Sequence, residues 1–154
     1  MHQRLLLMFL IALFGLPLAS ADEHKVQLMF VQTADSLKAD AKTLRLVNVG
    51  QQTLYFSDRP VRIAGHISMS AYLDEWKAGA NPANFASDPP NATLSVYEAG
   101  NKDNTIAVVE ISAPVVDGKD LVYRYKLIEG TMPKTGGPTA LFVDWIGVGG
   151  GVGP

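Results

Sequence analysis

Cysteine is absent from all 154 residues of the chain. The chain can therefore form no disulfide bond, no thiolate metal site and no cysteine nucleophile. A domain without disulfides depends on its hydrophobic core, and a chain of this length is long enough to build one.

Positive charge is also scarce. The chain has 13 lysines and arginines against 15 aspartates and glutamates, and without Arg4 the balance is 12 against 15, a formal charge of −3. Nucleic acids and anionic membrane surfaces both require a basic footprint on the protein that binds them. The charge balance therefore argues against either as a partner.

Long apolar runs are limited to one, Leu5–Leu18. This run is shorter than the roughly 20 residues that cross a bilayer. Arg4 precedes it and the small residues Ala19-Ser20-Ala21 follow, which is the layout of a secretory signal. We predict a signal peptide over residues 1–21, a periplasmic or secreted location, one soluble domain over residues 22–147 and a flexible Gly-rich tail over residues 148–154.

Strand patterns dominate what remains, and helical spacing is confined to Ser68–Ala78, with Ser68 or Ser70 as its cap. A parallel α/β sheet needs a helix between successive strands. We therefore predict an all-β fold, an antiparallel β-sandwich or flattened barrel with one inserted short helix. The predicted strands are Val26–Gln32, Thr43–Val49, Thr53–Phe56, Ala92–Tyr97, Thr105–Ala113, Leu121–Ile128 and Thr139–Ile146.

Several finer expectations follow from the turn residues. The polar stretch Thr33–Ala41 is predicted as a loop, and Gly50-Gln51 as the turn of a hairpin whose second strand points Leu54 and Phe56 inward. Pro114 is expected to end its strand.

Two further features concern the next hairpin and the core. Asp117-Gly118, between two β-rich runs, is typical of a hairpin turn. Trp76 and Phe85 are expected to anchor the core, the latter from the proline-rich stretch Asn81–Asn91.

The stretch Gln52–His66 combines a short strand with a charged cluster of Asp58, Arg59 and Arg62. Asp144 lies in an otherwise apolar strand, and a buried carboxylate is costly unless it is paired. One hypothesis is that Asp144 or Asp58 pairs with Arg59 beneath the proline-rich loop. The alternative is that Asp144 points to solvent, as strand alternation allows.

Catalytic patterns are weak in this chain. His66 could be combined with Ser68 or Ser70, but neither serine lies in a G-x-S-x-G turn, and both suit a helix cap better. His66, Asp58 and Asp88 could bind a divalent ion, although their spacing is not diagnostic. We therefore assign no catalytic residue, no metal and no cofactor, and the chain is interpreted as leaning away from an enzyme.

Four stretches carry a resemblance, namely FVQTA at Phe30–Ala34, YFSDRPVRIAGH at Tyr55–His66, SDPPNATLSV at Ser87–Val96 and MPKTGGPTALFVDWIG at Met132–Gly147. They resemble a family of small exported microbial proteins that is uncharacterised in activity. The resemblance covers nearly the whole mature chain and implies a single exported domain. The Gly-rich end after Gly147 departs from the pattern.

The function expected from these observations is an exported, non-enzymatic binding or accessory domain. Its expected surface is a loop face formed by Asp58–His66, Pro82–Asn91 and Met132–Pro138, because loops on a rigid scaffold usually carry binding. The candidate binding residues are Asp58, Arg59, Arg62, His66, Asp88 and Asn91. Its partner, a protein or a small molecule, and its oligomeric state stay open.

Two alternatives to this function stay open. The first is a periplasmic enzyme or metal protein that uses His66 with Asp58 or Asp88. The second is self-assembly through an edge strand, for which Val26–Gln32 is the expected strand.

Overall fold

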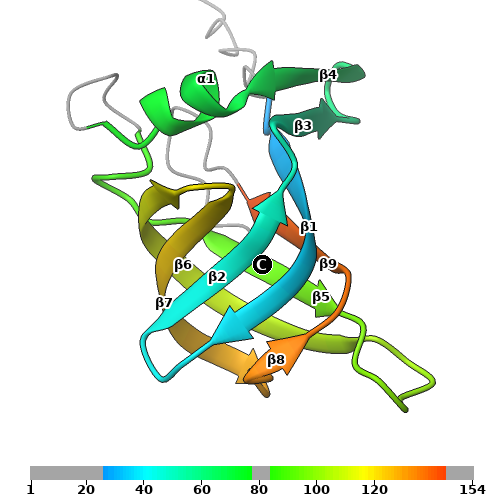
Figure 1. The fold of residues 1–154 in the computed structure, drawn as a ribbon. Coiled ribbons are helices and arrows are strands. Elements are labelled where there is room, and N and C mark those ends of the chain that lie inside the picture. Colours follow the sequence, from blue (N-terminus) through cyan, green and yellow to red (C-terminus); the bar gives the residue numbers. More distant parts are fainter. Residues whose placement is uncertain (1–25, 78–83, 145–154) are drawn as a thin grey trace, which may run out of the picture.

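A computed structural model describes residues 26–77 and 84–144, so the predicted signal peptide and the Gly-rich tail lie outside the described residues. The fold is mainly β, as predicted, with one short helix (Figure 1). The strands are β1 (Met29–Ala39), β2 (Thr43–Val49), β3 (Gln52–Ser57), β4 (Ile63–Ser68), β5 (Asn91–Val96), β6 (Thr105–Asp117), β7 (Asp120–Gly130), β8 (Thr135–Gly136) and β9 (Thr139–Asp144), and the helix is α1 (Met69–Asp74).

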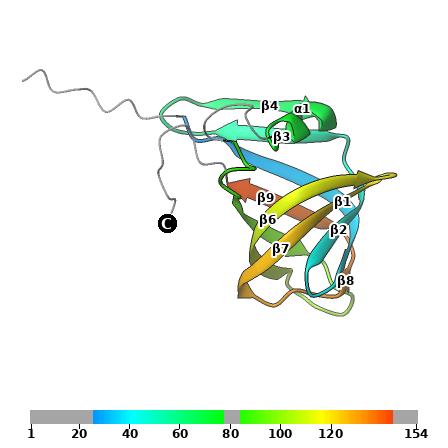
Figure 2. The same cartoon turned by 90° about the vertical axis from the view of Figure 1, so that its left-hand side faces the viewer.

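Six strands close into an antiparallel barrel in the order β2-β7-β6-β5-β9-β1, and β1 returns to pair with β2. Of the three remaining strands, β8 pairs with β1, and β3 and β4 extend from one end of β1. Helix α1 lies with β3 and β4 as a layer over that end of the barrel (Figure 2). No helix among residues 26–77 and 84–144 is long and apolar enough to span a membrane.

Strand β1 pairs with four other strands. One margin of β1 pairs with β9 and β8, and the other pairs first with β3 at Met29–Val31 and then with β2 at Ala34–Ala39. The prediction of a loop over Thr33–Ala41 was therefore wrong, because Ala34 and Leu37 are buried and keep the segment in the sheet. The predicted hairpin of β2 with β3 was also wrong, since both strands pair with β1 and not with each other.

The β6–β7 pair shows one error and one success of the sequence prediction. Pro114 does not end β6, because the ladder shifts register between Ser112 and Val115 and then continues to Asp117. A bulge of this kind accommodates a residue that cannot donate to the ladder. The turn at Asp117-Gly118 is confirmed, with Asp117 opposite Asp120.

Helix α1 closes the end of the barrel with aromatic side chains. Ser68 is its N-cap and accepts a hydrogen bond from the backbone N–H of Ala71, as one of the two predicted caps. Tyr72 is fully buried, and its ring lies 5.9 Å from that of Phe30. Trp76 packs 4.9 Å from the buried ring of Phe85, so both predicted anchors contact the core.

A buried chain of hydrogen bonds ties this end of the molecule together. The Tyr72 and Tyr123 hydroxyls lie 2.8 Å apart, Tyr123 donates to Gln32 Oε1 at 2.7 Å, and Gln32 Nε2 donates to Thr53 Oγ1 at 3.1 Å. Because the single hydroxyl proton of Tyr123 goes to Gln32, Tyr72 must be the donor to Tyr123. The chain thus joins α1, β7, β1 and β3.

Candidate functional site on the ribbon of β3 and β4

The two strands β3 and β4 form an antiparallel ribbon, here called the ribbon, with pairs from Gln52 opposite Ser68 to Ser57 opposite Ile63. β3 is anchored to the barrel through β1. Within the part of the chain that the structure describes, β4 pairs with β3 alone. The other margin of β4 therefore presents backbone groups that no described strand pairs with.

The outer face of the ribbon exposes two large apolar side chains. Leu54 is 50% exposed and Phe56 is 40% exposed, and they lie opposite His66 and Ala64 on β4. The expectation that both side chains point inward was wrong. Thr53 takes the inward position instead, because the buried amide of Gln32 donates a hydrogen bond to its hydroxyl, and strand alternation then turns its neighbours outward.

The inner face of the ribbon is held by Tyr55, whose ring lies over Gly65. A Cβ atom on Gly65 would lie 2.5 Å from the Tyr55 hydroxyl oxygen, so only glycine leaves room for this ring. An aromatic ring covering a cross-strand glycine stabilises an otherwise weak strand position. Tyr55 thereby packs against β4 on the side that faces the core, and no described strand pairs with the other margin of β4.

The tip of the ribbon carries the charged cluster that the sequence indicated. Arg62 Nε lies 3.2 Å from Asp58 Oδ1, and Arg59 Nε lies 4.0 Å from Asp58 Oδ2. The two arginine side chains are 87% and 93% exposed. Exposed pairs of this kind contribute little to stability, so the cluster is a surface feature and not an internal ion pair.

Asp144 does not complete the ion pair suggested with Arg59. It lies at the exposed end of β9, opposite Met29, and no ion pair joins it to Arg59 among the described residues. Partial burial raises the pKa of the Asp144 carboxyl above its usual value. The solvent-facing alternative therefore describes Asp144.

The residues considered for catalysis or metal binding do not converge. His66 is exposed on β4, and no hydrogen bond links it to a serine or a carboxylate within the described segments. Asp88 is exposed before the start of β5, and Asn91 is exposed at its first position. No group of three or more potential metal ligands is found among residues 26–77 and 84–144.

Two of the three loops expected to form one face lie far apart. β8, within Met132–Pro138, pairs with Leu37 and Lys38, whereas the ribbon joins β1 at Met29–Val31. At about 3.3 Å per residue, these points are roughly 20–25 Å apart along β1. Figure 1 shows β8 and the ribbon at opposite ends of the barrel, so the expectation of a single loop face was wrong.

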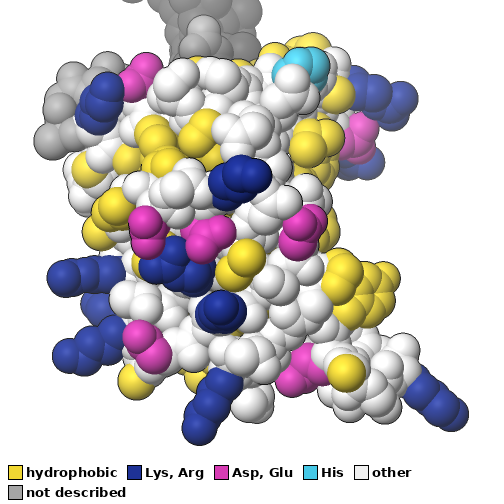
Figure 3. All heavy atoms as spheres, in the orientation of Figure 1, with side chains coloured by type: hydrophobic (Ala, Val, Ile, Leu, Met, Phe, Trp, Pro, Cys, Tyr) yellow, Lys and Arg dark blue, Asp and Glu magenta, His cyan; other side chains and the backbone are white. Residues whose placement is uncertain are grey.

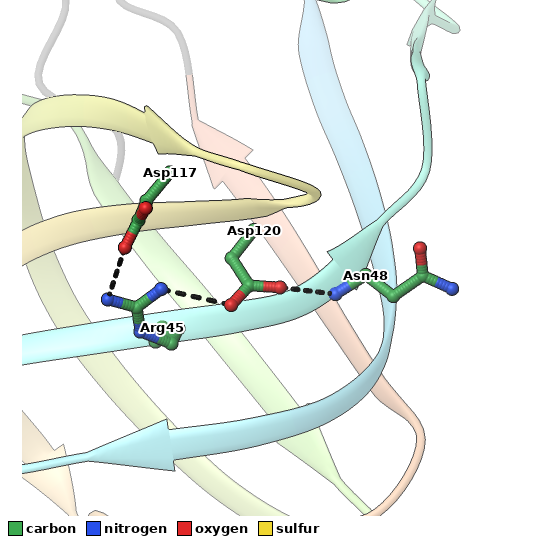
Figure 4. Close-up of polar contacts among 4 residues, drawn as sticks. All are labelled: Arg45, Asn48, Asp117 and Asp120. Carbon is green, nitrogen blue, oxygen red and sulfur yellow. Dashed lines mark hydrogen bonds and ion pairs between the residues drawn. The ribbon is translucent and has the colours of Figure 1, made fainter.

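A second polar cluster was missed by the sequence analysis. Arg45 on β2 binds Asp120 and Asp117 at 2.9 Å each, and the other Asp120 oxygen accepts the backbone N–H of Asn48 at 2.9 Å (Figure 4). The Asn48 N–H, followed by Arg45, lowers the pKa of the Asp120 carboxyl. No local pattern connects residues 72–75 positions apart, so only the fold reveals this clamp between β2 and the β6–β7 turn.

An open groove of about 470 Å³ lies beside this clamp, where β2 leads into β3. The groove is lined mostly by polar residues, and its lining consists of Thr33, Ala34, Asp35, Asn48, Val49, Gly50 and Gln51. Asn48 Nδ2 already donates to Asp35 Oδ2 at 2.6 Å, so the most polar groups in the groove bind each other.

Figure 3 shows hydrophobic side chains at the surface beside the charges of the ribbon tip, and mixed charges over the lower barrel. The ribbon therefore combines exposed apolar side chains, a strand margin that no described strand pairs with, and a charged end. Comparison of the chain with family models, with curated proteins and with solved structures finds no match.

Proposed function

We propose that this protein is an exported, non-enzymatic binding module that receives an extended segment of a partner polypeptide as an additional strand beside β4. The observation that carries the proposal is the open margin of β4 next to the exposed side chains of Leu54 and Phe56. Export is proposed from the leader layout of residues 1–21.

Proteins normally protect open strand margins with lysine, proline, bulges or short length. The other partly open margins of this barrel carry such features. On β6 the segment beyond Ser112 holds Pro114 and a register shift, and on β7 the segment beyond Tyr125 holds Lys126 and Glu129. The six residues of β4, IAGHIS, include no lysine, arginine, acidic residue or proline.

Strand addition fits the geometry of β4. In a ladder with one neighbour, every second residue turns its N–H and C=O groups to the free side, so about three of the residues of β4 can bind an added strand. Main-chain hydrogen bonds supply affinity in this mode of recognition, and alternate side chains supply specificity. Because Tyr55 and Thr53 hold the ribbon to the barrel, little order has to be gained on binding.

The alternatives are less well supported by the same observations. The catalytic or metal alternative needs His66 near a serine or carboxylates, whereas this side chain is exposed on the ribbon. Self-assembly through Val26–Gln32 would need a free margin there, but β1 pairs on both sides at Met29–Val31. We therefore place the docking margin on β4.

The test selects about eight-residue peptides from a random displayed library against the exported chain, and maps the bound peptide by amide hydrogen exchange. We expect protection of the amides of β4. Ala64→Lys should weaken the selected peptides at least tenfold, because it adds an edge lysine at an exposed position. The matched control Leu127→Lys changes a 48% exposed side chain on β7 and should leave binding unchanged.

Two results would overturn the proposal. One is that no peptide is selected. The other is that the selected peptides protect amides elsewhere on the barrel and bind the Ala64→Lys protein as well as the unchanged protein.

A further inference from the structure

The side chains along the outer face of β4 specify the chemistry of the added strand. We infer that the partner segment is an acidic one of the pattern apolar-x-apolar-x-carboxylate, with its carboxylate at the C-terminal end, beside Arg62. This inference rests on the proposed strand addition at β4.

The outer face of β4 has an order that a partner must match. Strand alternation places Arg62 on the same side as Ala64, His66 and Ser68. An added strand would therefore meet a guanidinium group, a methyl group, an imidazole and a hydroxyl in turn. The basic group stands at one end, so a matching strand has a distinct charged end.

The methyl group of Ala64 leaves Phe56 uncovered behind it. Phe56 lies opposite Ala64 on β3 and is 40% exposed. Neighbouring strands lie about 4.8 Å apart, so a long apolar side chain beside Ala64 can extend over it to the Phe56 ring. The next outward position of the added strand lies beside His66, with Leu54 behind it, and this position also favours an apolar side chain.

The charge at the tip favours a carboxylate. Arg59 and Arg62 share the single carboxylate of Asp58, which leaves a net charge of +1 on three highly exposed side chains. Arg59 contacts Asp58 only at 4.0 Å. A guanidinium group binds a carboxylate in a bidentate, charge-assisted manner, so an incoming Glu or Asp has a donor group available.

The direction of the segment follows from strand pairing. Antiparallel pairs are slightly more stable per residue than parallel pairs and are more common. Arg62 precedes β4 at its N-terminal end. In an antiparallel arrangement the partner residue beside Arg62 is therefore the C-terminal one of the segment.

The test uses acetylated and amidated peptides of about eight residues, so that the terminal charges are removed. One peptide alternates valine with threonine and ends on glutamate. A second ends on lysine, and a third carries the glutamate at its N-terminal end. Binding to the exported chain is measured by fluorescence anisotropy at low and high salt, with circular dichroism to check that each variant folds.

We expect the peptide that ends on glutamate to bind about tenfold more tightly than the other two at low salt, with the preference reduced at high salt. Arg62→Glu should reverse the preference between the glutamate and lysine peptides. Leu127→Lys should change neither affinity. Ala64→Lys should weaken both peptides, because it blocks the margin itself.

The outcomes separate the two proposals. If the three peptides bind equally and Ala64→Lys weakens them all, strand addition stands and the acidic partner is refuted. If none of the three peptides binds, both proposals are refuted. The acidic partner is also refuted if light scattering shows a second copy on β4, or if binding appears only after residues 145–154 are deleted, because the chain would then cover its own margin.

Discussion

Removing the Tyr123 hydroxyl should destabilise the protein far more than removing the Tyr72 hydroxyl, although the two groups bind each other. The reason is their position in the buried chain of hydrogen bonds. Tyr123 accepts from Tyr72 and donates to Gln32, whereas Tyr72 donates to Tyr123. Burial raises the pKa of Tyr72 against the opposing effects of Tyr123 and Trp76. The indole N–H of Trp76 has no hydrogen-bond partner among the described residues.

The magnitudes follow from what each change leaves unpaired. Tyr123→Phe leaves the Tyr72 hydroxyl without an acceptor and Gln32 Oε1 without a donor, and both residues are fully buried. Each unsatisfied buried group costs about 1–3 kcal/mol, so the expected loss for the two groups is roughly 2–6 kcal/mol. Tyr72→Phe leaves the bond from Tyr123 to Gln32 intact and should cost about 0.5–1.5 kcal/mol.

The double variant provides the sharper measurement. Tyr72→Phe with Tyr123→Phe removes the orphaned Tyr72 donor and leaves only Gln32 Oε1 unsatisfied. Adding Tyr72→Phe to Tyr123→Phe should therefore be neutral or stabilising. Coupled neighbours of this kind are not additive.

Urea unfolding followed by far-ultraviolet circular dichroism measures these free energies by linear extrapolation. A typical domain has about 5–15 kcal/mol of stability in total, so a loss at the upper end of the range should shift the midpoint strongly. Equal losses for the two single variants, or a double variant whose loss equals the sum of the singles, would refute the proposed direction of the hydrogen bonds.

Three further predictions concern pH and the turns. Burial raises the pKa of Tyr72 to about 12 from 10.0, so the unfolded chain releases this proton first. Tyr72 alone should lower stability by roughly 1.4 kcal/mol per pH unit between these values, and buried Tyr123, whose pKa is also raised, adds its own loss. Tyr72→Phe should therefore reduce the slope in urea titrations without abolishing it. Gly130→Ala should lower the free energy of unfolding, derived from Tm, by about 2 kcal/mol or more, because φ is +84° and a Cβ would lie 2.5 Å from the Ile106 carbonyl oxygen. The matched variant Gly118→Ala, at φ +62° with open space, should lower it by only about 1 kcal/mol. Asp120→Asn should flatten the acid limb of the profile of stability against pH. The lowered pKa of the Asp120 carboxyl stabilises the fold above the usual carboxyl range, and this stabilisation is lost as the pH falls through the lowered pKa. An unchanged acid limb would contradict that role.

Local patterns were sufficient for several elements of the fold. β2 begins and ends at the predicted residues, and β5 buries Ala92, Leu94 and Val96 as its alternation indicates. The hairpin turn at Asp117-Gly118 and the cap at Ser68 were also found from short-range signals. These features depend on neighbours within a few residues, which is the range over which backbone propensity and side-chain alternation act.

The candidate site could be predicted only in part. The sequence marked the charged tip at Asp58, Arg59 and Arg62, but the strand that follows it was read as part of a loop, because β4 contains glycine and histidine and little alternation. The outward direction of Leu54 and Phe56 was missed as well. No property of these side chains sets their direction, since the inward partner of the strand is Thr53, which binds Gln32 from 21 positions away.

By itself, the sequence determined the class of this protein, a cysteine-free, mainly β domain with one capped helix, because composition and alternation are local and additive. The tertiary structure alone decided which strand is left with an open margin, which side of the ribbon faces water and which distant carboxylates hold Arg45. Each of these depends on hydrogen bonds between segments far apart in the chain. The choice of partner on each margin of β1 settles them together, and no short window of residues contains that information.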